Sequence, residues 1–227
     1  MSKIRTINQL QNILDSELSW RLKEIANLKV VVRKSGNLSK NTAVRAAIPL
    51  LYGHWEGFIK NTATHYLEFV NGQSLKYSEL KTCFVVFGVK KKINDLVSSK
   101  NSKISISAID FLREEMNETA KLKIDSAIRT EFNLSSKVFE NIVRSIGLNI
   151  EKYEARFNLI DESLLSKRNY IAHGEFLDVD PEGFRSLADE ILKLLRWFKT
   201  DIENAVSLGE YKNEHNKMLL TEAKSFA

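Results

Sequence analysis

The chain contains very little proline and glycine, with 2 Pro and 9 Gly among 227 residues. An all-β protein needs many tight turns, which these residue types usually supply, so their scarcity argues against a sandwich or barrel. Cys83 is the single cysteine, which excludes an internal disulfide and a thiolate metal cluster. It lies in an apolar run, where we expect a small buried residue.

Long apolar runs are missing as well. No stretch approaches the ~18–20 apolar residues of a membrane span, and the N-terminus lacks the apolar core of a signal peptide. We therefore expect a cytoplasmic protein with no membrane segment. The content of 43% hydrophobic and 28% charged residues allows a substantial core and argues against general disorder. A net charge of +5 is mildly basic and favours a polyanionic partner only slightly.

Apolar residues recur at intervals of three and four along most of the chain, which predicts an all-α helical bundle. We expect helices over about 7–35 and 39–72, and a helix over 78–98 whose apolar run alone would also allow a strand. A short helix that Ser135 or Ser136 caps and Gly147 ends follows, and Asp180-Pro181 begins a long last helix. The apolar stripes of the long helices are Ile7, Leu10, Leu14, Leu18, Ile25, Leu28 and Val32; Val44, Ala47, Leu51, Trp55, Phe58, Thr62, Tyr66 and Phe69; and Phe184, Leu187, Ile191, Leu194, Phe198, Ile202 and Ala205.

These helices indicate a single domain over residues 1–208, followed by a polar C-terminal tail at 209–227. A short helix around 215–223 is compatible with the tail sequence. Residues 99–134 are the least regular part of the domain, because only 105–116 shows a helical period. We interpret 99–134 as a variable insertion at the edge of the domain.

The segment Arg168-Asn169-Tyr170-Ile171-Ala172-His173-Gly174 contains the most informative polar residues. We expect a helix that Asp161 caps and Gly174 ends. Helical spacing places Arg168 on the same stripe as Leu164, Leu165 and Ala172. A guanidinium on a core-facing stripe is costly unless it is paired or lines a cleft. The segment therefore indicates a site, although pairing of Arg168 with an acid and simple capping by His173 would also explain it.

Helix geometry limits how Arg168 and His173 can cooperate. Five residues of a regular helix turn about 500°, so the two side chains leave the axis roughly 140° apart. They cannot both point into one cleft from an ideal helix. Either the helix loosens at Ala172-His173-Gly174, or a second copy of the chain completes the site in a symmetric dimer.

The pattern Arg168-Asn169-Tyr170-Ile171-Ala172-His173 resembles the Arg-x4-6-His signature of the HEPN superfamily, with the polar residue after Arg that its ribonuclease members favour. The stretch Pro49-Leu50-Leu51-Tyr52-Gly53-His54-Trp55-Glu56-Gly57 is similar to a branch of HEPN-like nucleases from bacterial toxin and defence loci. The order of helices agrees with this resemblance over most of the chain. It implies an all-α, HEPN-like bundle that forms a homodimer, with two motifs facing each other across a composite cleft.

The resemblance also implies a function, namely a metal-independent endoribonuclease without cofactors that acts as a toxin or in phage defence. His173 would be the general acid or base, Arg168 would stabilise charge on the scissile phosphate, and Asn169 would orient His173 or the phosphate. Attack by the ribose 2′-OH would leave a cyclic phosphate and restrict the enzyme to RNA. The partners implied are RNA, a second subunit and a neutralising antitoxin.

Other residues are weaker candidates. Lys167 and Tyr170 are expected to contact substrate, and Glu56 would reach the cleft around Arg168 unless it is a solvated or structural carboxylate. His54 and Glu56 are two positions apart and point to different sides of a helix, so they do not form a zinc site. We expect Trp55 to be a core residue.

Two other functions remain open at this stage. One is a non-catalytic HEPN-like dimeric module that binds a nucleotide or a partner protein. The other is a basic helical DNA-binding protein, which ranks last because no groove-reading motif can be recognised.

Overall fold

The computed structural model describes residues 4–36, 39–98, 100–124, 127–131, 133–178 and 180–213. Within these ranges the protein is all-α, and its only β-type pairs are the isolated bridges Lys76–Thr119 and Leu80–Lys212. The same ranges contain no helix with the length and apolar character needed to cross a membrane. The helix considered for 215–223 lies outside the described residues.

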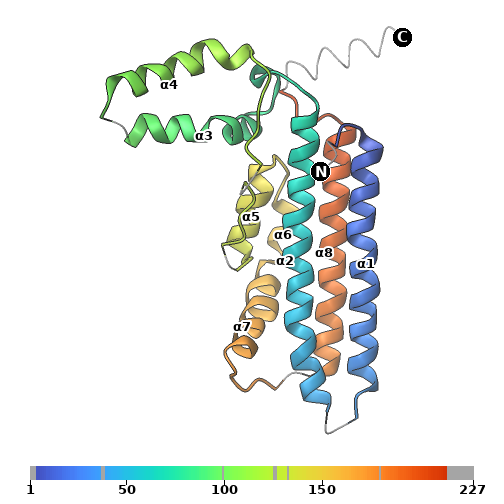
Figure 1. Ribbon diagram of the computed structural model, residues 1–227. Coiled ribbons are helices and arrows are strands. Elements are labelled where there is room, and N and C mark those ends of the chain that lie inside the picture. Colours follow the sequence, from blue (N-terminus) through green and yellow to red (C-terminus); the bar gives the residue numbers. More distant parts are fainter. Residues whose placement is uncertain are drawn as a thin grey trace.

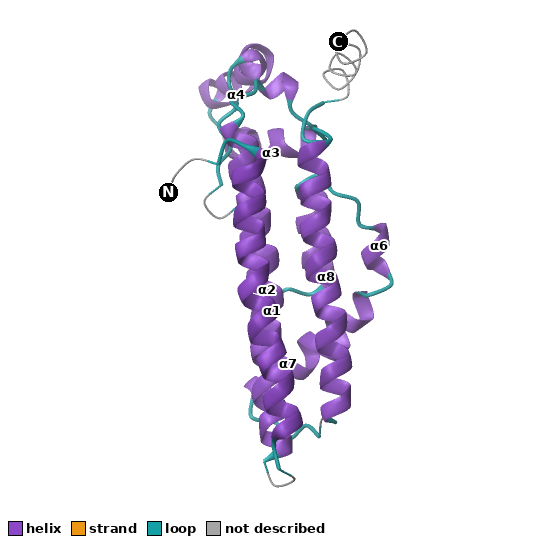
Figure 2. Ribbon diagram, turned by 90° about the vertical axis from the view of Figure 1, so that its right-hand side faces the viewer, coloured by secondary structure: helices purple, strands orange, loops and turns teal. Residues whose placement is uncertain are grey.

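Three long helices lie side by side and form the body of the molecule: α1 (Ile7–Lys34), α2 (Lys40–Gly72) and α8 (Pro181–Ser207) (Figures 1 and 2). The stripes predicted for α2 and α8 are buried throughout, and that of α1 is buried except at Ile7 and Leu28. Asp180 caps α8 as predicted, since its carboxylate accepts a hydrogen bond from the Gly183 N–H at 3.0 Å. The apolar period therefore determines the bundle.

Shorter helices lie along one side of α2 in Figure 1: α5 (Ser136–Ser145), η3 (Leu159–Ser166) and α7 (Lys167–Ala172). The short helix α6 (Glu151–Glu154) lies beside α8 (Figure 2), where the Tyr153 hydroxyl donates to Asp201. Ser135 caps α5, and Gly147 ends the following turn with φ +76°, both as predicted. Phe139 of α5 joins this layer to the bundle, because its ring lies 4.9 Å from Trp55 of α2 and 5.9 Å from Phe198 of α8.

A helical hairpin projects from one end of the bundle and consists of α3 (Thr82–Ser98) and α4 (Ser102–Glu114), flanked by the 3-10 turns η1 (Tyr77–Glu79) and η2 (Glu115–Asn117) (Figure 1). The prediction of one helix over 78–98 is wrong at its start. Leu80 has extended backbone, and Lys81 donates its N–H to the Tyr211 carbonyl at 2.9 Å. This pairing with the chain after α8 separates η1 from α3. The helix predicted from 105 begins three residues earlier, at Ser102.

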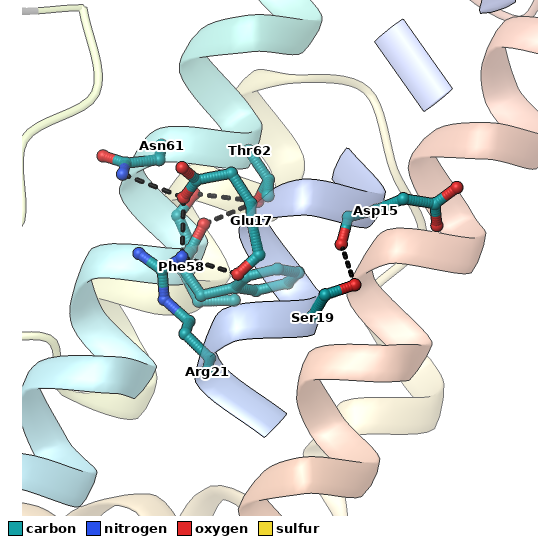
Figure 3. A network of polar contacts seen from close by, with 8 residues as sticks. Asp15, Glu17, Ser19, Arg21, Phe58, Asn61 and Thr62 are labelled. Atoms are coloured by element: carbon teal, nitrogen blue, oxygen red, sulfur yellow. Dashed lines mark hydrogen bonds and ion pairs between the residues drawn. The ribbon is translucent and has the colours of Figure 1, made fainter. Parts of the chain in front are cut away.

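Polar side chains join α1 to α2 inside the bundle (Figure 3). Arg21 is only 3% exposed, and its Nη1 donates to the backbone carbonyl and to Oε2 of Glu17, both at 2.7 Å. Asn61 of α2 donates to the same Oε2 at 3.0 Å. The Arg21 guanidinium also lies 4.2 Å from the ring centroid of the half-exposed Trp20. A buried charge is retained here because its partners lie within hydrogen-bond distance.

Candidate functional site

The segment before the motif is a π-helix, which the sequence pattern did not predict. Residues Leu159–Ser166 form η3, which continues directly into α7. In a π-helix each N–H bonds the carbonyl five residues earlier, so the turn is wider than in an α-helix and side-chain spacing changes. Such segments are rare and occur frequently at functional sites. Residues 159–166 therefore depart from the α-helical spacing that the sequence pattern predicted through this segment.

Asp161 does not cap the motif helix, so this prediction is wrong. The helical segment already begins at Leu159, and Asp161 lies inside it. Its carboxylate instead accepts hydrogen bonds from the backbone N–H of Ser136 at 2.7 Å and from the Ser136 hydroxyl at 2.5 Å. A carboxylate at a helix N-terminus is favourable because the first N–H groups there lack partners within the helix. Asp161 thus joins η3 to the start of α5.

The guanidinium of the half-buried Arg168 connects three separate parts of the chain. Its Nη1 donates to Oδ1 of the neighbouring Asn169, and its Nη2 donates to Oδ1 of Asn133, both at 2.8 Å. Its carbon Cζ lies 4.0 Å from the ring centroid of Tyr52 on α2. Arg168 thereby ties α7 to α2 and to the loop that precedes α5. The expectation that a core-facing guanidinium would need partners agrees with this geometry.

Tyr52 on α2 packs its ring against the Arg168 guanidinium. Its hydroxyl accepts a hydrogen bond from the Leu134 N–H at 2.6 Å. Burial raises the pKa of Tyr52, and the charge of Glu56 adds to this, while hydrogen bonds from Leu134 and Arg168 oppose it. Glu56 therefore acts electrostatically on the Tyr52 hydroxyl that Arg168 contacts. The phenol remains neutral at physiological pH and serves as an acceptor and a stacking surface.

Whereas Arg168 is half-buried, His173 is exposed to solvent. The helix does not loosen before it, since the His173 N–H still bonds the Asn169 carbonyl at 2.9 Å. The turn then closes with bonds from Gly174 to Ile171 at 3.1 Å and from Glu175 to Tyr170 at 2.9 Å, with Gly174 at φ +77°. This is a Schellman turn, which requires a left-handed residue where glycine stands. The helix thus keeps its bonding up to His173 and ends within Ala172-His173-Gly174, so which of the two routes brings Arg168 and His173 together stays a prediction.

The residues around His173 are also open to solvent. Ala172 is exposed, so the predicted apolar stripe does not extend to it, because α7 ends before another turn could pack on the core. Lys167 and Asn169 are half-buried, whereas Tyr170 is 48% exposed and Phe176 is 83% exposed. The motif and the residues directly after it therefore carry two exposed aromatic rings.

The segment after the motif crosses the first turns of α2. Arg45 donates from Nη1 to the Glu175 carbonyl at 2.9 Å, and Asn41 donates to Oδ1 of Asp178 at 3.3 Å. These contacts fix the backbone that follows His173, although most side chains of residues 174–178 are exposed. The motif is therefore fixed at its start by the contacts of Arg168 and after its end by the contacts of residues 175–178 with α2.

The Pro49–Gly57 stretch uses two faces of α2. Tyr52 contacts the motif helix, whereas the buried His54 faces α1, with Nε2 3.3 Å from Oε2 of Glu24. Burial lowers the pKa of His54, with a smaller lowering by Arg21 and an opposing effect of Glu24. A Cβ on Gly57 would lie 3.3 Å from Nη2 of Arg21, so this glycine makes room for the buried guanidinium. Trp55 is fully buried, as expected.

Sequence reasoning missed three contributors to the site. Tyr52 precedes Glu56 by one helical turn, so its place on the same face was a usable signal. Asn133 and Leu134 carry no such signal, since they lie in a loop without a period.

Cys83 is half-buried, and burial raises its pKa. Among the described residues, no group of His, Cys, Asp and Glu is arranged to hold a metal ion.

Comparison with known proteins supplies one match, to the family described as RiboL-PSP-HEPN, whose model covers residues 16–204. That range contains the Pro49–Gly57 stretch, Arg168, Asn169 and His173. No curated protein and no solved structure matches. The matched range includes most of the chain, and with it α2, the projecting hairpin and the motif helix. The chain therefore belongs to the RiboL-PSP-HEPN family of the HEPN superfamily.

Proposed function

We propose that this protein is a metal-independent endoribonuclease that acts on RNA. The observation that carries the proposal is the division of the motif, with Arg168 fixed on the inner side of α7 and His173 exposed at its end. HEPN domains are generally ribonucleases and commonly bind RNA, which supports the same interpretation. An exposed imidazole can approach a bound substrate without any rearrangement of the core.

The chemistry that fits these groups is an internal transfer at a phosphodiester. The ribose 2′-oxygen forms a bond to the adjacent phosphorus, the bond from phosphorus to the 5′-oxygen breaks, and the products are a 2′,3′-cyclic phosphate and a 5′-hydroxyl. The 2′-OH loses a proton and the leaving 5′-oxygen gains one, so no water is consumed. His173 would transfer one of these protons, and histidine is suited to proton transfer near neutral pH.

Arg168 and Asn169 would act on the phosphate. A guanidinium stabilises negative charge that develops on phosphoryl oxygens, and one held in place by its neighbours needs little reorganisation to do so. Tyr52, Asn133 and Asn169 supply that hold in this protein. Lys167, on the same helix, is the nearest further candidate for a phosphate contact, and Tyr170 for a contact with a base.

A second copy of the chain would complete the cleft. Arg168 points to the interior and His173 to solvent, so one chain presents only half of a convergent arrangement. HEPN domains often dimerise. The exposed rings of Tyr170 and Phe176 beside the motif support an interface there, because a two-fold contact would bury them. We place this activity in the cytoplasm, as a toxin or phage-defence effector that an antitoxin restrains.

One observation favours a second candidate, a non-catalytic dimeric module that binds a nucleotide or a partner protein. The Arg168 guanidinium already contacts Tyr52, Asn133 and Asn169 within the chain, which is what a purely structural arginine would do. Under that function His173 would be a helix-capping residue without a chemical role. The two candidates differ in whether pure protein cleaves RNA.

The test is cleavage of a mixed RNA pool by purified protein in EDTA, with the His173→Ala variant alongside. We expect fragments with cyclic phosphate ends from the parent protein, a loss of about 100-fold or more in rate for His173→Ala, and no cleavage of DNA of the same sequence. His65→Ala, which removes another imidazole from α2, is the matched control and should cleave at the parent rate. Equal rates for the parent and His173→Ala would eliminate the mechanism.

Mixing the two proteins tests the composite cleft. If both subunits contribute to each active site, an excess of inactive His173→Ala protein should suppress parent activity below its share of the mixture. Activity strictly proportional to the parent fraction would show that each chain works alone. If no RNA is cleaved under any condition and the protein is still a dimer, the non-catalytic module is favoured.

A further inference from the structure

A cavity of about 370 Å³ lies at the end of the bundle where α1 ends and where α2 and α8 begin, which is the lower end in Figure 1. Its volume is within the range of pockets that bind small ligands. Apolar side chains of α1 and α8 form part of its wall, among them Val30, Val32 and Leu192. None of the motif residues lines it, so it is a separate feature of the surface.

Positive charge dominates the rest of the wall. Lys29, Arg33, Lys40 and Arg185 line the cavity, against one acidic residue, Glu182. Lys29 is paired with Asp189 at 2.5 Å, and Arg185 lies 3.6 Å from Glu182. Within the described part of the chain, the side chains of Arg33 and Lys40 have no ion pair or hydrogen bond. The cavity therefore presents unneutralised cations beside an apolar wall.

The cavity is connected to the motif through the backbone. Residues 174–178 follow His173 and are held on α2 by Asn41 and Arg45. The chain then reaches Pro181, which lines the cavity. Even fully extended, the chain from His173 to Pro181 spans at most about 29 Å. A single-stranded RNA a few nucleotides long can bridge that separation.

We propose that this cavity binds one nucleotide of the RNA substrate, a short distance along the strand from the bond that is cleaved. Arg33 and Lys40 hold its phosphate, with Arg185 at the rim, and the apolar wall of Val30 and Leu192 receives the base. This inference rests on the proposed function for its ligand. A phosphate ester that carries a planar base can also come from a free nucleotide, and the experiment distinguishes the two sources.

The test measures binding of a labelled single-stranded RNA to His173→Ala protein, in which the RNA stays intact. The double variant Arg33→Glu/Lys40→Glu in this background should bind about tenfold more weakly. The slope of the logarithm of the binding constant against the logarithm of the salt concentration should also become shallower, by about 0.7 for each phosphate that the variant no longer neutralises. Lys23→Glu/Lys34→Glu is the matched control, because it reverses two charges on exposed residues of α1 that do not line the cavity. The control should bind as tightly as His173→Ala alone.

Competition with adenosine monophosphate distinguishes an RNA strand from a free nucleotide as the ligand of the cavity. If the cavity serves the RNA strand, the free nucleotide at millimolar concentration should displace little RNA, since it makes one contact of several. Strong displacement that the Arg33→Glu/Lys40→Glu pair abolishes would assign the cavity to a free nucleotide instead and would overturn the RNA assignment. Equal RNA binding by the cavity variant and the control would overturn the site altogether.

Failure of this inference can be told apart from failure of the proposed function. RNA binding is measured with His173→Ala protein, so the result does not depend on catalysis. In the otherwise unaltered protein, the Arg33→Glu/Lys40→Glu pair should lower kcat/KM for RNA cleavage by the same factor as binding. If the Arg33→Glu/Lys40→Glu variant binds RNA as tightly as its parent, and the protein still cleaves RNA, the cavity is not an RNA-binding site but the proposed nuclease activity stands.

Discussion

At the scale of single residues, Arg168 and His173 differ in how far they depend on the fold. Arg168 contacts a ring on α2, an amide in the loop before α5 and an amide on its own helix. His173 is exposed, and it is attached mainly through its backbone. Substitution of Arg168 therefore changes structure and any chemistry together, whereas substitution of His173 changes the chemistry almost alone.

Arg168→Ala should lower the free energy of unfolding by roughly 2–3 kcal/mol, because it removes charged hydrogen bonds and a contact between a cation and a ring. Urea unfolding followed by far-UV circular dichroism measures this. His173→Ala should stay within about 0.5 kcal/mol of the parent, as expected for an exposed side chain. Arg144→Ala is the matched arginine control, since Arg144 is exposed and, among the residues that the structure describes, pairs only with Glu140 on α5. Similar unfolding energies for Arg168→Ala and Arg144→Ala would show that the contacts of Arg168 do not stabilise the fold.

The sequence allowed part of this site to be predicted. The position of Arg168 near an apolar stripe indicated that its charge would need partners, and partners are present. Their identity could not be predicted, because Asn133 is far away in sequence and lies in an irregular loop. Glu56 was one of the weaker candidates, against a solvated or structural carboxylate, and its charge contributes to the raised pKa of Tyr52. Whether it takes part in substrate binding stays a prediction.

At the scale of elements, α2 is the helix on which the site depends. One of its faces carries Tyr52 under Arg168, and another packs His54 and Gly57 against α1. Its two interior glycines, Gly53 and Gly57, are one turn apart but have different surroundings. Nothing lies within 4 Å of a Cβ built on Gly53, whereas one on Gly57 would meet the buried Arg21.

Gly53→Ala should raise the free energy of unfolding by about 0.5–1 kcal/mol, because alanine loses less backbone entropy than glycine in a helix interior. Gly57→Ala should gain the same entropic stabilisation, but the added Cβ forces the Arg21 side chain to move while Glu17 holds it. Its net effect on the free energy of unfolding should therefore be a smaller gain or a loss. Chemical denaturation of the two variants side by side makes the comparison. A Gly57→Ala protein as stable as Gly53→Ala would mean that Arg21 shifts at no cost.

Helix ends with local signals were predictable, and those that depend on neighbours were not. Asp180, Ser135 and Gly147 act where their residue types indicated, because capping involves only nearby backbone groups. The π-helix at Leu159–Ser166 was missed, since its residues would fit an α-helix equally well. Asp161 has a partner in α5 rather than in its own helix, and sequence spacing carries no information about that contact.

At the scale of the whole molecule, stability should depend on pH through the interface between α1 and α2. His54 is buried there, with Glu24, Arg21 and the Trp20 ring around it. Burial lowers its pKa below the ordinary value of 6.5, so the unfolded chain binds a proton more readily than the folded one. The contribution of His54 is therefore fully present above about pH 6.5 and is lost as the pH falls towards the folded pKa.

His54→Gln should weaken this pH dependence, because an amide retains a hydrogen-bond donor for Glu24 but does not titrate. Unfolding energies at pH 7.5, 6.5 and 5.5 should fall more steeply for the parent than for the variant. Carboxylates elsewhere affect both proteins alike, so the difference between the two curves isolates His54. Parallel curves over this range would contradict the assignment.

The sequence by itself determined the all-α bundle, the main helix ends and the position of the motif, because apolar period and capping are local and repeat along the chain. Its HEPN resemblance is confirmed by the family to which the chain belongs. Only the tertiary structure decided that Arg168 contacts Tyr52 and Asn133, and that Asp161 bonds to the start of another helix. Those outcomes depend on contacts between residues far apart in sequence, which no spacing along the chain encodes.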